Sequence, residues 1–134
     1  MNDTRASDLI LLLLRLGFGG LMILQHGLPK LEKLFWGDPN QFADPLGIGA
    51  VLSLVIVVII EVLFSLLLIA GLFTRLSTIP LIIVMLVVIF VVFSPGTLGD
   101  KELGLLYLFA FIAILIGGPG YYSLDRMFKR GIKY

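Results

Sequence analysis

Residues 48–71 read IGAVLSLVIVVIIEVLFSLLLIAG, a run of 24 positions whose one charged side chain is Glu61. A helix rises by ~1.5 Å per residue, so about 20 apolar residues cross the ~30 Å hydrocarbon core of a bilayer. The run is rich in valine and isoleucine, which also suit a buried strand. Its length favours a helix, because an open sheet in lipid leaves backbone groups unpaired and the strands of a closed barrel alternate in polarity. The run therefore predicts a transmembrane helix.

Three further apolar runs flank this one, separated by turn signals that contain glycine and proline. They cover residues 9–28, 76–94 and 100–118. We predict an all-α, polytopic membrane protein with a single domain over residues 1–134. In this prediction a bundle of four transmembrane helices is accompanied by short interfacial segments at residues 31–36 and 121–130, which mix charged with bulky apolar side chains.

The composition excludes several classes of protein. Of the 134 residues, 59% are hydrophobic and 14% are charged, whereas soluble domains carry about a quarter charged residues. An ordinary soluble globule is therefore excluded, and the lipid bilayer is the expected partner of the surface. The chain has no cysteine, which excludes disulfides and thiolate metal or redox sites. A net charge of +1 gives no basic face for nucleic acid, so no nucleic-acid partner is expected.

The basic residues outside the spans are unevenly distributed. Six fall on the side that holds both termini and the loop between the second and third spans: Arg5, Arg75, Arg126, Lys129, Arg130 and Lys133. Three fall on the opposite side: Lys30, Lys33 and Lys101. By the positive-inside tendency we expect a multi-pass protein of the inner (plasma) membrane with both termini in the cytoplasm.

Two charged residues lie well inside the spans, Arg15 and Glu61. If the first span begins on the inner side at Leu9, Arg15 lies roughly 9 Å above that end and Glu61 roughly 15 Å above it. We therefore expect these two side chains to form a buried ion pair. Two interpretations stay open: a pair that fixes helix register without chemistry, or a proton-accepting carboxylate whose pKa is controlled by Arg15.

The single histidine, His26, is a second candidate. It follows Arg15 by eleven positions, which places both on nearly the same helix face. It also falls at the outer end of the bundle, where we expect it to contact Glu102, with Tyr107 one turn deeper and Lys30 nearby. Such a cluster offers hydrogen-bond donors to a quinone carbonyl. The alternative is a lone interfacial histidine. No metal site is expected, because one histidine and scattered carboxylates have no ligand spacing.

Several short motifs, in order and at compatible spacing, resemble the DoxX family of small four-helix membrane proteins. They are residues 14–17 (LRLG), 26–30 (HGLPK), Glu61, 71–75 (GLFTR), 102–107 (ELGLLY) and 118–126 (GPGYYSLDR). The family is related to the small subunit of thiosulfate:quinone oxidoreductases. The resemblance implies a four-helix bundle in the inner membrane and, loosely, a link to quinone.

Three functions follow as hypotheses. The first is a quinone-linked subunit of a membrane oxidoreductase complex, in which a separate partner donates electrons; the candidate quinone-binding residues are His26, Lys30, Glu102 and Tyr107. The second is a non-catalytic membrane scaffold or assembly factor. The third is a small-solute or proton carrier that uses Glu61. A protein partner or a homo-oligomer is expected in each case, quinone is the one cofactor suggested, and catalytic residues stay unassigned.

Overall fold

The computed structural model describes residues 2–131, and all of its regular elements are helical, as predicted. In chain order they are α1 (Asp3–Met22), η1 (Ile23–Gly27), α2 (Leu28–Trp36), η2 (Pro39–Gln41), α3 (Ala50–Val58), η3 (Ile59–Phe64), α4 (Ser65–Ala70), α5 (Thr74–Val87), η4 (Val88–Val92), α6 (Leu98–Gly117) and α7 (Leu124–Gly131). The segments η1, η3 and η4 are π-helical, and η2 is a 3₁₀ turn.

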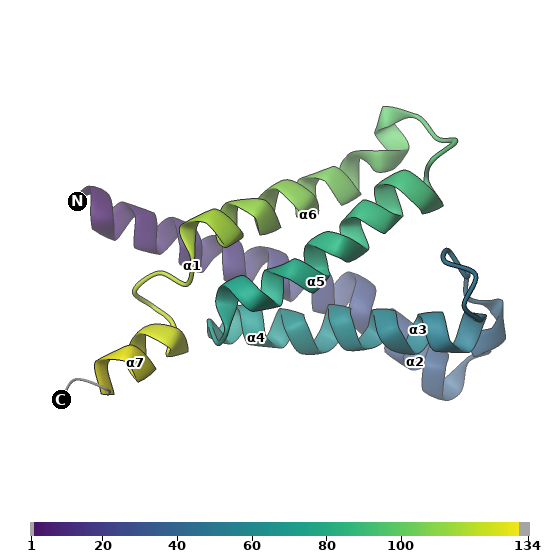
Figure 1. Ribbon diagram of the computed structural model, residues 1–134, viewed down its shortest axis with the longest axis horizontal. Helices are drawn as coiled ribbons and strands as arrows, with labels where there is room; N and C mark the ends of the chain where they lie inside the picture. Colours follow the sequence, from purple (N-terminus) through teal and green to yellow (C-terminus); the bar gives the residue numbers. More distant parts are fainter. Residues whose placement is uncertain (1, 132–134) are drawn as a thin grey trace.

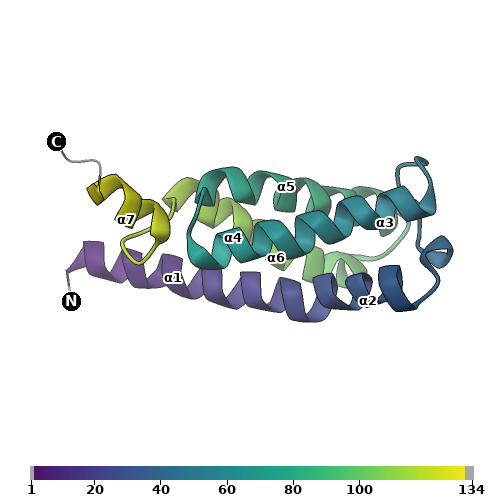
Figure 2. The ribbon, with the colours of Figure 1, turned by 90° about the horizontal axis from the view of Figure 1, so that it is seen from below.

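These elements form four long rods and one short helix (Figures 1 and 2). The rods are α1–η1–α2, α3–η3–α4, α5–η4 and α6. Within residues 2–131, three helices are long and apolar enough to cross a membrane: Asp3–Trp36, Ala50–Ala70 and Thr74–Val92. The fourth rod, α6, is 20 residues long and lies along α5 (Figure 1).

The first rod is longer than the sequence predicted. Its helix was expected to end at Leu28 because Pro29 follows, but the chain continues as a helix to Trp36. The π-helical turn η1 explains the continuation: the Leu28 N–H bonds to the carbonyl of Ile23, and Pro29 then falls in the first turn of α2. Proline is tolerated inside such a helix because a local π-helical adjustment can satisfy the backbone groups that its missing N–H leaves free.

Apolar side chains face both inward and outward. The buried core includes Met22, Leu68, Leu81, Phe111 and Ile114. Large apolar side chains also cover the outer faces of the rods, among them Leu13, Phe90, Phe109 and Ile116. An outer surface of this kind is costly in water and suits contact with lipid tails.

Both described ends of the chain and the α4–α5 hairpin lie at one end of the molecule, which we call the α7 end (Figure 1). Ser123 caps α7, since its Oγ accepts the Arg126 N–H at 3.2 Å. Asp125 reaches back to α5, where its carboxylate accepts the N–H groups of Phe73 and Thr74 at 2.8 and 3.0 Å. Lys133, counted above with the basic residues of this end, lies outside the described residues.

The hairpin depends on Gly71. This residue has φ +71°, and a Cβ atom there would lie 2.5 Å from the Ser123 Cβ and 2.7 Å from the Arg15 guanidinium. We therefore expect Gly71→Ala to lower the free energy of unfolding by about 3 kcal/mol, through backbone strain and overpacking. Thermal unfolding in detergent, followed by circular dichroism, measures the change.

Gly20→Ala is the matched control for Gly71→Ala. A Cβ at Gly20 meets nothing within 4 Å, and alanine is favoured over glycine inside a helix by up to about 1 kcal/mol. Gly20→Ala should therefore leave stability unchanged or raise it slightly. Equal destabilisation by the two substitutions would contradict the role assigned to Gly71.

Candidate functional site

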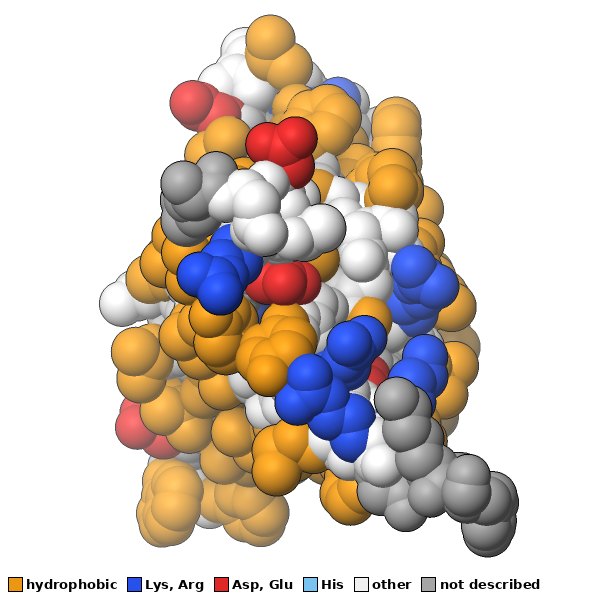
Figure 3. All heavy atoms as spheres, turned by 90° about the vertical axis from the view of Figure 1, so that its left-hand side faces the viewer, with side chains coloured by type: hydrophobic (Ala, Val, Ile, Leu, Met, Phe, Trp, Pro, Cys, Tyr) orange, Lys and Arg blue, Asp and Glu red, His pale blue; other side chains and the backbone are white. Residues whose placement is uncertain are grey.

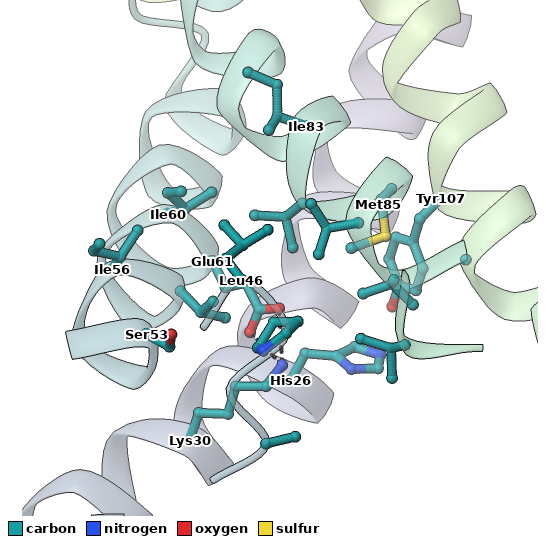
Figure 4. Close-up of a pocket in the computed structure, with 18 of the residues that line it drawn as sticks. His26, Lys30, Leu46, Ser53, Ile56, Ile60, Glu61, Ile83, Met85 and Tyr107 are labelled. Carbon is teal, nitrogen blue, oxygen red and sulfur yellow. Dashed lines mark hydrogen bonds and ion pairs between the residues drawn. The ribbon is translucent and has the colours of Figure 1, made fainter. Parts of the chain in front are cut away.

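A cavity of about 450 Å³ lies at the end of the molecule opposite α7. Its wall is formed by side chains from all four rods and from the loop at residues 42–48. Most of these side chains are aliphatic. The polar ones are His26, Lys30, Ser53, Glu61, Asp100 and Tyr107, and all of these except Asp100 are labelled in Figure 4.

The strongest polar interaction in the cavity joins two rods. The Lys30 Nζ of α2 lies 2.8 Å from each carboxylate oxygen of Glu61 in η3. The Glu61 side chain is 2% exposed and that of Lys30 is 27% exposed. A buried carboxylate is costly without a partner, so Lys30 accounts for the presence of Glu61 at this depth.

The second polar group consists of His26 and Tyr107. Their rings meet edge to face with centroids 5.4 Å apart, and Tyr107 also packs against Phe18 and Phe111. No side chain or backbone group among residues 2–131 forms a hydrogen bond with the His26 ring or the Tyr107 hydroxyl within the distance and angle limits of such a bond. These polar atoms line the cavity and are available to a ligand.

Each of the three π-helical segments contributes to the cavity wall. His26 lies in η1, Glu61 in η3 and Val92 in η4. A π-helical turn inserts an extra residue and rotates the side chains that follow it, and such turns are frequent at functional sites. The insertions thus help to direct His26 and Glu61 into the same space.

Part of the cavity wall is formed by apolar side chains of α3 and α5 that the protein covers incompletely. Ile56 of α3 and Ile83 of α5 line the cavity and are 40% and 53% exposed. The wall formed by these two helices is therefore apolar and only partly shielded.

The loop at residues 42–48 covers one side of the cavity and is anchored by Asp44. Its carboxylate accepts hydrogen bonds from the Ser53 hydroxyl at 2.7 Å and from the N–H groups of Gly49 and Ile48 at 2.7 and 3.1 Å. The Ser53 hydroxyl, followed by these backbone groups, holds the pKa of Asp44 below its ordinary value. The anchor is therefore charged at neutral pH and fixes the loop to the start of α3.

The predicted ion pair between Arg15 and Glu61 is wrong. The Arg15 guanidinium turns to the α7 end and donates to four backbone carbonyls: those of Leu68 (3.0 Å), Ile69 (3.0 Å), Pro119 (2.7 Å) and Tyr122 (3.0 Å). The physical reason is that the last turn of a helix, here α4, presents carbonyls that lack intrahelical donors and carry partial negative charge. Arg15 is thus a structural residue, away from the cavity.

The expected contact between His26 and Glu102 is also wrong. Glu102 is exposed and is not part of the cavity wall. Five positions separate it from Tyr107, which corresponds to about 140° around a helix, so both side chains cannot face the same cavity. His26 instead contacts Tyr107.

Of the candidate quinone-binding residues, the structure brings His26, Lys30 and Tyr107 together and leaves Glu102 outside. Sequence reasoning did not identify the pairing of Lys30 with Glu61 because it ended the first span at Leu28, before Pro29. One signal was available: Lys30 follows His26 by four positions, which puts them on one face of any helix that continues through Pro29.

Comparison with known proteins gives one match. The model of the family described as DoxX matches residues 10–94, which include His26, Lys30 and Glu61 of the cavity and Arg15 of the α7 end. No curated protein and no solved structure matches the chain.

Proposed function

The chain belongs to the DoxX family, and from this premise we propose that it is a quinone-binding subunit of a membrane oxidoreductase complex. The observation that carries the proposal is the cavity: an apolar space, lined in part by exposed aliphatic side chains, with His26, Tyr107 and an ion pair on its wall. In this proposal a separate partner protein supplies the electrons, because the chain has no cysteine and one histidine with which to hold a redox centre.

The cavity has properties that a quinone requires. Its volume of about 450 Å³ falls in the range of small-molecule sites, roughly 300–1,000 Å³. A quinone head is a flat ring with two carbonyl acceptors, and its tail is apolar. The aliphatic wall suits the ring, and His26 and Tyr107 offer donors to a carbonyl. In this proposal the tail leaves the cavity past the partly exposed side chains of Ile56 and Ile83.

Four polar residues of the cavity wall act on the bound molecule in this proposal. The Tyr107 hydroxyl and a His26 ring N–H donate to the carbonyl oxygens and orient the ring. The Lys30 Nζ and Glu61 carboxylate, 2.8 Å apart, exchange a proton with the bound molecule, since reduction of a quinone consumes two protons as well as two electrons. The aliphatic wall excludes water, which strengthens these interactions.

The proposal also fixes the orientation of the protein. Three charged residues occur near the start of α6, and the remaining part, residues 103–117, is apolar. Because α6 lies along α5 (Figure 1), we propose that it forms a fourth span. With four spans, both termini lie on the same side of the membrane. Because basic residues are in excess on that side, we propose that the protein lies in the inner membrane with both termini in the cytoplasm.

Titration of the purified protein with a short-chain benzoquinone or naphthoquinone analogue tests the function. We expect saturable quenching of Trp36, the one tryptophan, which lies at the end of α2. Tyr107→Phe and His26→Ala should each weaken binding about tenfold, the loss expected for one hydrogen bond in a site shielded from water.

Glu102→Gln is the control, because Glu102 lies off the cavity wall and its loss should leave the affinity unchanged. This variant also distinguishes the structure, which leaves Glu102 outside the cavity, from the sequence analysis, which predicted Glu102 to bind the quinone. Unchanged affinity in both Tyr107→Phe and His26→Ala, with normal folding, rules out the quinone site and favours a scaffold role.

A further inference from the structure

A second hollow lies at the α7 end and takes no part in the proposed quinone site. It has a volume of about 410 Å³ and is bordered by the first turns of α1, by the turn before α7, and by α7 itself. Its lining residues are Thr4, Asp8, Pro119, Gly120, Tyr121, Arg126 and Lys129. We call it the terminal groove.

The terminal groove is held in a defined shape by polar contacts. The Asp8 Oδ1 accepts the Tyr121 N–H at 2.9 Å, which ties the turn to α1. The Arg126 and Arg130 guanidinium carbons lie 5.8 and 4.6 Å from the centroid of the Tyr121 ring, and an Arg130 nitrogen donates to the Tyr121 hydroxyl at 3.0 Å. The Arg126 and Arg130 guanidinium groups are therefore held beside Tyr121 before any ligand arrives.

The surroundings of the groove identify the membrane surface as its environment. Thr4 and Asp8 come directly before the apolar run that starts at Leu9. On α7, Met127 and Phe128 are 65% and 58% exposed next to the cations. Figure 3, which views this end of the molecule, has Lys and Arg side chains gathered among hydrophobic ones. A helix that combines exposed apolar and basic side chains is typical of the headgroup region.

We propose that the terminal groove binds the headgroup of an anionic phospholipid, with its phosphodiester between Arg126 and Lys129. Asp8 also borders the groove, and its carboxylate already accepts the Tyr121 N–H. Met127 and Phe128 then rest against the upper acyl chains, which is the reason to assign a lipid here instead of free phosphate. Basic residues at a membrane surface attract anionic lipids through the negative surface potential.

The test measures lipid retention by the full-length protein. The wild type is reconstituted in nanodiscs of phosphatidylglycerol and phosphatidylcholine, released, and examined by native mass spectrometry for bound lipid. We expect phosphatidylglycerol to be retained in preference to phosphatidylcholine. The double variant Arg126→Gln/Lys129→Gln should retain it about thirtyfold less, which corresponds to ~1 kcal/mol for each charge lost. The conservative variant Arg126→Lys/Lys129→Arg should retain most of it.

A charge-matched variant at the other end, Lys33→Gln/Lys101→Gln, controls for a general effect of lost charge and should keep wild-type retention. Equal loss in this control overturns the site, as does equal retention of the two lipids by the wild type. Inorganic phosphate at millimolar concentration provides the last arm: complete displacement of the lipid identifies a free-phosphate site and overturns the assignment to lipid. The unfolding temperature of each variant is measured as well. A value near that of the wild type shows that a loss of retained lipid comes from weaker binding and not from unfolding.

Discussion

Arg15→Leu is expected to lower the free energy of unfolding by about 4 kcal/mol, one of the two largest losses expected for a single substitution. The guanidinium donates to four carbonyls from two separate parts of the chain: two in the last turn of α4 and two in the turn before α7. Each hydrogen bond to a charged donor contributes about 1.5–3 kcal/mol, and buried carbonyls left without a donor add their own cost. Leucine keeps the volume and removes every one of these bonds.

Thermal unfolding in mild detergent measures this effect, with an expected fall of roughly 10 °C or more. Arg15→Lys should be intermediate, because one ammonium lacks the planar fork that reaches several acceptors. Arg75→Leu is the control at the same end. Arg75 is exposed, and the one hydrogen bond that its side chain forms among residues 2–131 is 3.4 Å long. Exposed sites of this kind change stability by about 0.5 kcal/mol or less. Similar losses for Arg15→Leu and Arg75→Leu would show that the carbonyl contacts contribute little.

Lys30→Met is the second substitution with a large expected effect, about 3–5 kcal/mol of stability. It removes the cation 2.8 Å from a carboxylate that is 2% exposed, and a buried charge left without its partner is costly. Glu61→Gln should cost less, because the Lys30 side chain is 27% exposed and its ammonium can extend toward water.

The double variant Lys30→Met/Glu61→Leu separates stability from function. Replacing both partners of a buried pair by apolar residues is often neutral, so we expect most of the stability to return while quinone-analogue affinity stays low. Lys33→Met is the control on the same helix, since Lys33 is exposed and lies off the cavity wall; it should change neither quantity. Recovery of both stability and affinity in the double variant would mean that the pair has only a structural role.

Much of the fold was accessible from the sequence. Residues 48–71 predicted a membrane helix, and the structure has a helical rod over Ala50–Ala70. The run at 76–94 likewise corresponds to Thr74–Val92. These predictions succeed because span length and side-chain hydrophobicity are local properties, and a bilayer leaves a long apolar segment few alternatives to a helix.

The partners of the buried charges were decided by the tertiary structure alone. Depth along the membrane placed Arg15 and Glu61 at compatible heights. In the structure, however, Arg15 donates hydrogen bonds to carbonyls more than 50 positions away, and Glu61 pairs with Lys30. Depth is one coordinate, and a contact also depends on the rotation of each rod about its axis. Here that rotation is altered by the π-helical turns η1 and η3. The sequence thus determined which residues must be shielded from lipid, while the packing of the rods determined which of them meet.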